Sequence, residues 1–113
     1  MKTEVRFHGL ESSESLRNHA ARRIHFHLSR FGHELSAVVV RIGDVNGPKG
    51  GLDKRCRVTV RGPRVGSSSL DEYSGDAWSA VDLAVERISR NIGRSLEKAR
   101  SLARGQRTEE EVS

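Results

Sequence analysis

The segment from Tyr73 to Arg104 limits the fold most, because it has the spacing of one long helix lying on a core. At about 100° per residue, its apolar residues gather on a single flank of such a helix. These residues are Ala77, Val81, Ala84, Val85, Ile88, Ile92, Leu96 and Ala99. Their i, i+3/i+4, i+7 pattern is typical of a helix that packs one face against other elements. We therefore expect the rest of the chain to supply a surface that this helix covers.

The charges of this predicted helix are sorted by sign around its axis. Asp82, Glu86 and Glu97 fall on one flank. The flank beside the apolar one holds four cations, which are Arg87, Arg90, Arg94 and Lys98. A helix that is only solvated more often alternates its signs for i,i+4 pairing. A cationic stripe on a rigid element favours a polyanion as partner.

The composition points the same way. The chain has 113 residues, enough for one domain, with 20 Lys and Arg against 15 Asp and Glu, for a net charge of +5. Arginine supplies most of the positive charge, which suits bidentate contacts to phosphate. No apolar run approaches the ~18 residues of a membrane span, and the charged start has no signal-peptide core, so we expect a cytoplasmic protein without a membrane partner. The single Cys56 excludes a disulfide framework and a thiolate metal site.

Four other segments have the composition or alternation of β-strands. They cover residues 2–8, 35–42, 55–61 and, with a weaker pattern of one glycine and three serines, 64–70. In the third, Cys56, Val58 and Val60 point inward, and the residues between them point outward. Residues 43–54 are rich in Gly, Asn and Pro and predict a loop.

Residues 16–31 predict a first, shorter helix, with an N-cap at Ser12 or Ser13 and a C′ glycine at Gly32. Its side carries a second basic flank that contains an aromatic residue: Arg22, Arg23, Phe26 and Arg30. We expect this flank to extend the cationic stripe of the long helix across a groove between the two helices.

The order β-α-β-β-β-α predicts an α+β two-layer sandwich. The first helix is a crossover that makes the first two strands parallel, and short turns make the later pairs antiparallel. Both helices then cover one face of a four-stranded mixed sheet and leave the other face open to solvent. We assign residues 1–105 to this single domain and residues 106–113 to a flexible acidic tail.

The Gly-rich loop and two clusters of polar residues are the other candidate sites in the sequence. The loop lacks the ending of a P-loop, but Lys49, Lys54 and Arg55 give it a second candidate RNA contact. The five histidines have no partners at metal-ligand spacing, so we predict no metal and no cofactor. An acidic cluster (Asp71, Glu72 and Asp76) has the pattern of turn and N-cap residues ahead of the long helix.

Two aromatic residues have open assignments. Trp78 is favoured as a core residue over a base-stacking one. Phe26, which lies among arginines, is the better candidate for base stacking, with an extension of the core as the alternative.

Two runs of the long helix carry a resemblance to a known family. They are Asp76-Ala77-Trp78-Ser79-Ala80-Val81-Asp82 and Arg87-Ile88-Ser89-Arg90-Asn91-Ile92. Together with the order of elements, Ser29-Arg30-Phe31 at the end of the first helix and the loop Asn46–Cys56, they resemble the hibernation-promoting factor / RaiA family of ribosome-associated proteins. The likeness covers about residues 2–100. Trp78 stands where tyrosine is usual, and Phe26 where lysine is expected.

The resemblance implies a non-enzymatic, monomeric translation inhibitor that acts on the ribosome under stress. Members of the family bind the small ribosomal subunit where mRNA and the A- and P-site tRNAs sit, and they silence and protect idle ribosomes. The positions that match the RNA-facing residues of the family are Arg23, Arg30, Arg87, Arg90 and Arg94. Arg22 and Lys98 are added from their place on the predicted helices. The resemblance covers the short form, without the C-terminal dimerisation domain that pairs ribosomes.

Three alternatives stay open at this point. A double-stranded-RNA-type module acting off the ribosome would have a similar topology. A small acid-base hydrolase would use the acidic cluster with a histidine. A scaffold would dimerise through the open sheet face, but Arg55, Arg57 and Arg61 on that face disfavour a dry interface and suit an acidic partner.

Overall fold

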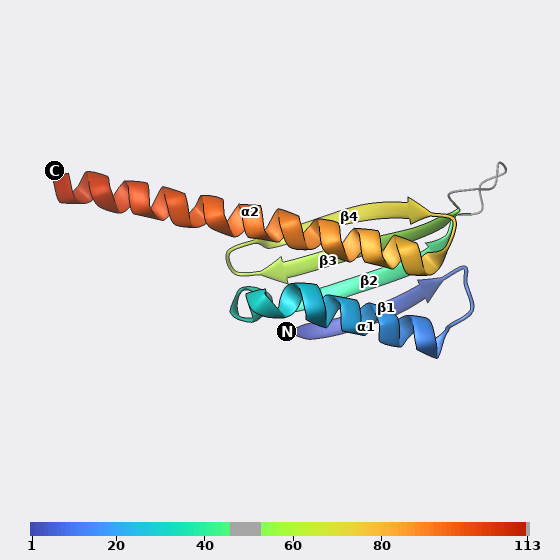
Figure 1. Ribbon diagram of the computed structural model, residues 1–113. Helices are drawn as coiled ribbons and strands as arrows, with labels where there is room; N and C mark the ends of the chain where they lie inside the picture. Colours follow the sequence, from blue (N-terminus) through green and yellow to red (C-terminus); the bar gives the residue numbers. More distant parts are fainter. Residues whose placement is uncertain (46–52, 113) are drawn as a thin grey trace.

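A computed structural model describes residues 1–45 and 53–112, and its elements follow the predicted order (Figure 1). The strands are β1 (Lys2–His8), β2 (Ala37–Asp44), β3 (Lys54–Gly62) and β4 (Gly66–Ser74). The helices are α1 (Glu14–Leu28), the short 3-10 helix η1 (Ser29–Glu34) and α2 (Ala77–Val112).

The four strands form one mixed sheet in the order β1-β2-β3-β4. β1 and β2 are parallel and are joined through α1, whereas β2/β3 and β3/β4 are antiparallel. A parallel pair needs such a crossover, and antiparallel neighbours need only a turn or loop. The predicted fold class is confirmed.

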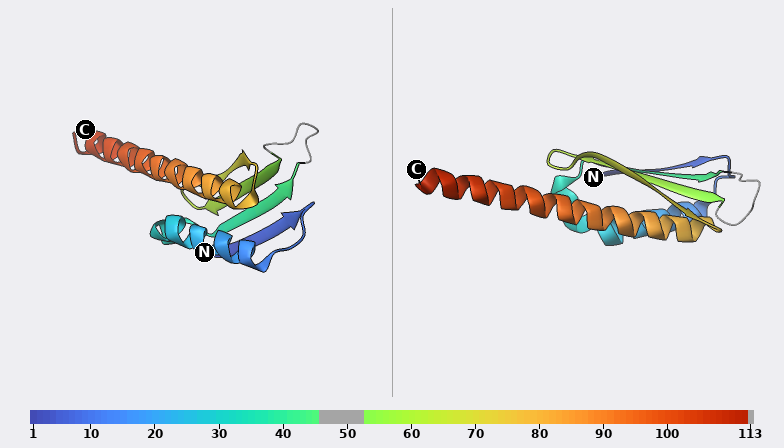
Figure 2. Two further views of the ribbon diagram at one scale, coloured as in Figure 1. Left: turned by 45° about the vertical axis from the view of Figure 1, so that its right-hand side comes forward. Right: turned by 90° about the horizontal axis from the view of Figure 1, so that it is seen from above.

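The helices cover one face of the sheet and leave the other bare (Figure 2). α2 packs on β3 and β4, while α1 lies beside α2 and over the β1 side of the sheet. The final turns of α2 extend past the end of the sheet, which makes the molecule 62 Å long.

The core lies between these two layers and contains the apolar residues that the periodicity selected. Cys56, Val58 and Val60 of β3 are fully buried, as predicted from their alternation. The apolar flank of α2 is buried as far as Leu96, and Ala99 is half-buried, because α2 leaves the sheet there. Burial raises the pKa of the Cys56 thiol to about 12, which suits an inert core residue.

The start of α1 is as predicted, but its end is different. Ser13 is the N-cap, and its Oγ accepts a hydrogen bond from the backbone N–H of Leu16 at 3.2 Å. Gly32 is not a C′ glycine, because α1 stops at Leu28 and continues as η1 without a left-handed residue. The chain then passes so close to β3 that a Cβ on Gly62 would overlap the carbonyl oxygen of Glu34.

The boundary between β4 and α2 also differs from the prediction. β4 extends to Ser74, past the predicted end at Leu70, because pairing with β3 organises Asp71, Glu72 and Ser74, whose own β-propensity is low. Residues 73–76 therefore precede the helix. Asp76 caps it, because its carboxylate accepts from the backbone N–H of Ser79 at 3.0 Å and from the Ser79 hydroxyl at 2.7 Å.

Helix α2 continues to Val112, so its backbone includes residues 106–112, which were expected to form a flexible tail. The added residues are mostly good helix formers, and extending an existing helix avoids the cost of nucleation. The flexibility of this segment stays a prediction.

Trp78 is not a core residue, contrary to expectation. It is 41% exposed, and its ring lies 4.7 Å from that of His19, centroid to centroid. The apolar flank of α2 faces the sheet, whereas Trp78 points toward α1 at the edge of the core.

Candidate nucleic-acid interface

Several cations and the aromatic ring of Phe26 are exposed on the two helices. Arg22 on α1 and Arg90, Arg94 and Lys98 on α2 are exposed, which leaves their charges accessible. Phe26 on α1 is 72% exposed, so it does not extend the core. We call these five residues the outer helix flank.

Arg23 does not belong to that surface, because it is held between the helices. Its Nε lies 3.2 Å from Oδ1 of Asp82 on α2, buried and not aligned for a hydrogen bond. Nη2 of Arg23 donates a hydrogen bond to Nε2 of His27 at 2.9 Å. Burial and the charge of Arg23 lower the pKa of His27, so the neutral ring that accepts from Arg23 is favoured.

The contact between α1 and α2 is therefore partly acidic. Asp82 also contacts Nε2 of His19 at 2.7 Å, and it lies on the flank of α2 that faces α1. The charge of Glu86, one turn further along α2, opposes this lowering of the His27 pKa, but its effect is smaller than those of burial and Arg23. We call Asp82, Glu86, His19, Arg23 and His27 the helix seam.

Arg87 lies on the opposite side of α2 from the seam. Its guanidinium donates to Oε1 of Glu72 on β4 at 2.6 Å. The expectation that Arg23 and Arg87 belong to one continuous stripe is therefore wrong. The acidic flank of α2 packs toward α1, because the apolar flank fixes how the helix is rotated on the sheet.

Arg30 and Arg94 are exposed but have local contacts. Arg30 donates to Oγ of Ser89 at 3.3 Å and sits 4.5 Å above the centre of the Phe31 ring. Arg94 donates to the side chain of Asn91, one turn earlier on the same helix. Both contacts are weak enough to exchange for a phosphate at the surface.

The candidate loop contact is only partly described. Lys49 lies outside the described residues. Lys54 is the first residue of β3 and not part of the loop. Its Nζ contacts Asp53 at 3.0 Å and Asp44 at 3.3 Å, and the hydrogen bond to Asp53 raises the pKa of Lys54. Arg55 follows on β3 and points to the open sheet face.

The acidic cluster does not gather into a site. Asp71 and Glu72 are neighbours on β4, so they point to opposite faces of the sheet, and both are engaged: Asp71 with Arg57, Glu72 with Arg87. Asp76 caps α2. Within residues 1–45 and 53–112, no three His, Cys, Asp or Glu side chains converge as a metal site would need.

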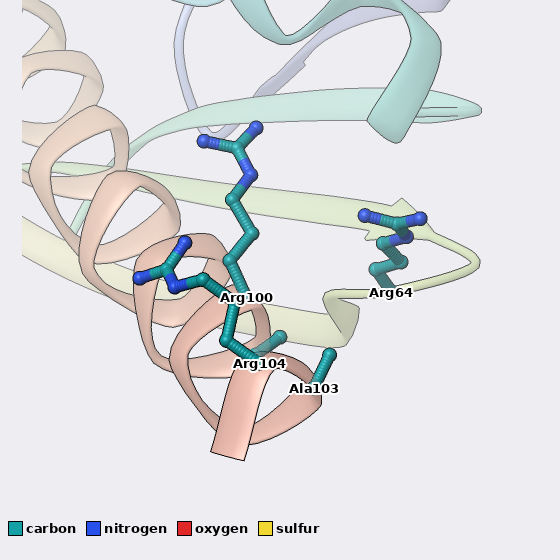
Figure 3. Close-up of a pocket in the computed structure, with 5 residues that line it drawn as sticks. Arg64, Arg100, Ala103 and Arg104 are labelled. Carbon is teal, nitrogen blue, oxygen red and sulfur yellow. The ribbon is translucent and has the colours of Figure 1, made fainter. Parts of the chain in front are cut away.

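Two groups of arginines lie outside the helical stripes, and only Arg55, Arg57 and Arg61 of the second group were expected from the sequence. One lines a cavity of about 510 Å³ between the β3–β4 turn and α2, with Arg64 on the turn and Arg100 and Arg104 on α2 (Figure 3). The other lies on the open sheet face, where strand alternation is the signal that finds it. Across the part of the chain that the structure describes, no helix has the length and apolarity to cross a bilayer.

Comparisons with known proteins identify relatives of this chain. The model of the family described as Sigma 54 modulation protein / S30EA ribosomal protein matches residues 3–100, which confirms the resemblance found in the sequence. A search of the curated proteins finds no match.

Solved structures share the fold at low sequence identity. The Protein Y N-terminal domain from Thermus thermophilus superposes with a TM-score of 0.66 and 20% identity, over 83% of this chain and 98% of that one. A ribosomal subunit interface protein from Coxiella burnetii gives 0.69 and 18%, over 83% and 96%.

Proposed function

Because the chain belongs to the Sigma 54 modulation protein / S30EA ribosomal protein family, we propose that it binds RNA of the small ribosomal subunit through the outer helix flank. Membership of this family supports an association of the chain with the ribosome. The finer proposal specifies which surface meets which RNA group.

The observation that carries the proposal is the accessibility of the cations on the outer helix flank. Arg22, Arg90, Arg94 and Lys98 are exposed on two rigid helices, so binding a phosphate there breaks no buried ion pair. Arginine and lysine side chains on helices contact phosphates without reading base edges, so the RNA is selected by shape. The exposed ring of Phe26 adds a surface on which one base can stack.

The remaining family positions have a different role in this proposal. Arg23 and Arg87 contact carboxylates, so they hold the helices to each other and to the sheet. Arg30 lies between the two groups and joins the RNA contact once its weak bond to Ser89 is exchanged. Direct binding therefore rests mainly on Arg22, Arg90, Arg94 and Lys98, with Lys49 as a contact from the loop.

We further propose that occupation of this RNA silences the subunit. A monomer bound where mRNA and tRNA sit would block both without chemistry, as the resemblance to hibernation factors implies. Such a protein would act in the cytoplasm, under stress, on idle ribosomes.

Cosedimentation with purified small subunits tests the RNA contact. The wild-type chain should comigrate at low salt and dissociate between about 50 and 200 mM salt. Binding releases counterions from the RNA phosphates, and this release favours the complex less as the salt concentration rises. Arg90→Glu combined with Arg94→Glu should abolish comigration. The matched control is Arg90→Lys with Arg94→Lys, which keeps both charges and should keep most of the binding.

Two outcomes contradict the proposal. One is absence of the wild-type chain from the subunit fraction at low salt, and the other is equal binding by the Glu and Lys variants. Competition with free duplex RNA separates the ribosomal role from a double-stranded-RNA-type module, because such a module would leave the subunits for the duplex.

A further inference from the structure

The bare face of the sheet holds most of the net charge of the protein. Alternation along β1, β2 and β3 points six cations away from the helices, which are Lys2, Arg6, Arg41, Arg55, Arg57 and Arg61. Among the residues that the structure describes, two carboxylates share this open sheet face, Glu4 and Asp71. The excess of four positive charges compares with +5 for the whole chain.

Strand register brings three of these arginines into one row. Arg6 is paired with Arg41, and Arg41 with Arg57, across three neighbouring strands. Adjacent strands lie about 4.8 Å apart, and like charges directly opposite each other destabilise a sheet. The repulsion within such a row destabilises the folded chain, and a bound anionic ligand would reduce it.

The two carboxylates neutralise the ends of the row and leave its centre unpaired. Glu4 contacts Arg6 at 2.9 Å, and Asp71 accepts two hydrogen bonds from Arg57, at 2.7 and 3.0 Å. Among the described residues, Arg41 and Arg61 have no carboxylate within ion-pairing distance, and both are exposed.

Two adjoining hollows on this face share Arg6 and Arg41. The larger, about 340 Å³, is also bordered by His8 and Arg55, over Gly43, which has no side chain to fill the space. The smaller, about 230 Å³, is also bordered by Thr59 and Arg61. The cations thus surround space that a ligand can enter.

The spacing and chemistry of this face suit a phosphate backbone. Successive outward residues of β3 lie about 6.7 Å apart, so Arg55, Arg57, Thr59 and Arg61 line up along one strand. Arg61 is free to donate two hydrogen bonds to a phosphate, whereas Arg57 already donates two to Asp71. The hydroxyl of Thr59 lies 2.7 Å from that of Ser69. Tyr73, 42% exposed beside Arg55 at the edge, can stack one base, and the other outward residues mainly offer contacts to phosphates. A second copy of the chain would bring the same positive charge and be repelled.

We propose that the open sheet face is a second RNA-binding surface, which holds the backbone of a single-stranded segment through Arg41, Arg61 and the arginines beside them. It lies on the opposite side of the sheet from the two helices (Figure 2). The protein then contacts two RNA segments at once, one on each face. This surface is independent of the proposed helix contact.

Binding of a fluorescent single-stranded uridine oligonucleotide, measured by anisotropy over a range of salt, tests the proposal. Arg41→Gln with Arg61→Gln leaves no carboxylate orphaned, and thermal melts check that the fold is kept. The affinity at low salt should fall roughly tenfold, and the slope of log K against log salt should decrease by about 1.4. Arg41→Lys with Arg61→Lys should restore the binding, and Glu4→Gln should strengthen it.

The outcomes separate this surface from the helix contact. Binding that is unchanged in the Gln variant but lost in Arg90→Gln with Arg94→Gln would overturn the sheet-face proposal and leave the helix contact standing. Tight binding of a polyglutamate peptide with no binding of the oligonucleotide would show an acidic protein partner and also overturn it. Loss of oligonucleotide binding in the Gln variant supports the surface, even when the chain fails to bind small subunits.

Discussion

Asp82 separates the cations of the two helices, so removing its charge tests how the helix seam affects RNA binding. Its side chain is 40% exposed and contacts Nε2 of His19 and Nε of Arg23. We expect Asp82→Asn to weaken the fold slightly and to tighten RNA binding. The two effects have opposite signs because the same carboxylate attracts Arg23 and repels phosphate.

The loss of stability follows from the exposure of the two contacts. Partly exposed ion pairs contribute about 0.2–1 kcal/mol each, so the free energy of unfolding should fall by about 0.5–2 kcal/mol. For a domain of this size, that corresponds to a drop in Tm of roughly 2–10 °C. The amide can still accept a hydrogen bond from His19, which keeps the loss near the lower end.

The gain in affinity follows from Coulomb's law. A phosphate about 8 Å from the carboxylate is repelled by about 0.5 kcal/mol in water, and by about 2 kcal/mol at an effective dielectric constant of about 20. Binding to small subunits should therefore tighten about twofold to thirtyfold at low salt. Salt should reduce the gain, since exposed charges are screened over about 10 Å at 0.1 M.

The assay is a titration of labelled protein with small subunits, next to a thermal melt of each variant. Glu11→Gln is the matched control, because Glu11 is exposed in the turn before α1 and its neutralisation changes the net charge equally. An affinity of Asp82→Asn no higher than that of Glu11→Gln, in a folded protein, would refute the electrostatic account of the seam.

Three further predictions concern stability and reactivity. Gly62→Ala should lower the free energy of unfolding by several kcal/mol in a urea titration, because a Cβ there overlaps a carbonyl oxygen, whereas Gly32→Ala, with open space around it, should be neutral or slightly stabilising. Cys56 should stay unreactive toward a thiol reagent at pH 8 until the chain unfolds, because it is fully buried and its pKa is about 12; rapid labelling of the native protein would contradict its place in the core. The hydrogen bonds from Arg57 hold the pKa of Asp71 below its usual 3.8, so their stabilisation is present above pH 3.8 and is lost as the pH falls through the lower, folded value. Arg57→Gln should make acid unfolding measured by circular dichroism less dependent on this carboxyl, and an unchanged acid profile would show that the pair contributes nothing.

Local sequence was a good guide wherever burial decides the structure. The inward residues of β3 and the apolar flank of α2 were predicted from their periods alone, since each element must bury one face. Local sequence failed where a partner element decides. Residues 71–74 join β4 through pairing with β3, and Trp78 stays at the surface because the sheet, not the residue's own hydrophobicity, sets the rotation of α2.

The sequence by itself determined the order of elements, the two layers, the core and the side of each element on which its cations lie. Only the tertiary structure decided which of those cations are accessible. Glu72 reaches Arg87 and Asp82 reaches Arg23 across different elements, and strand register alone puts Arg6, Arg41 and Arg57 in one row. The physical reason is that burial is set by a residue's own chemistry and period, whereas charge pairing depends on which residues packing brings within about 4 Å.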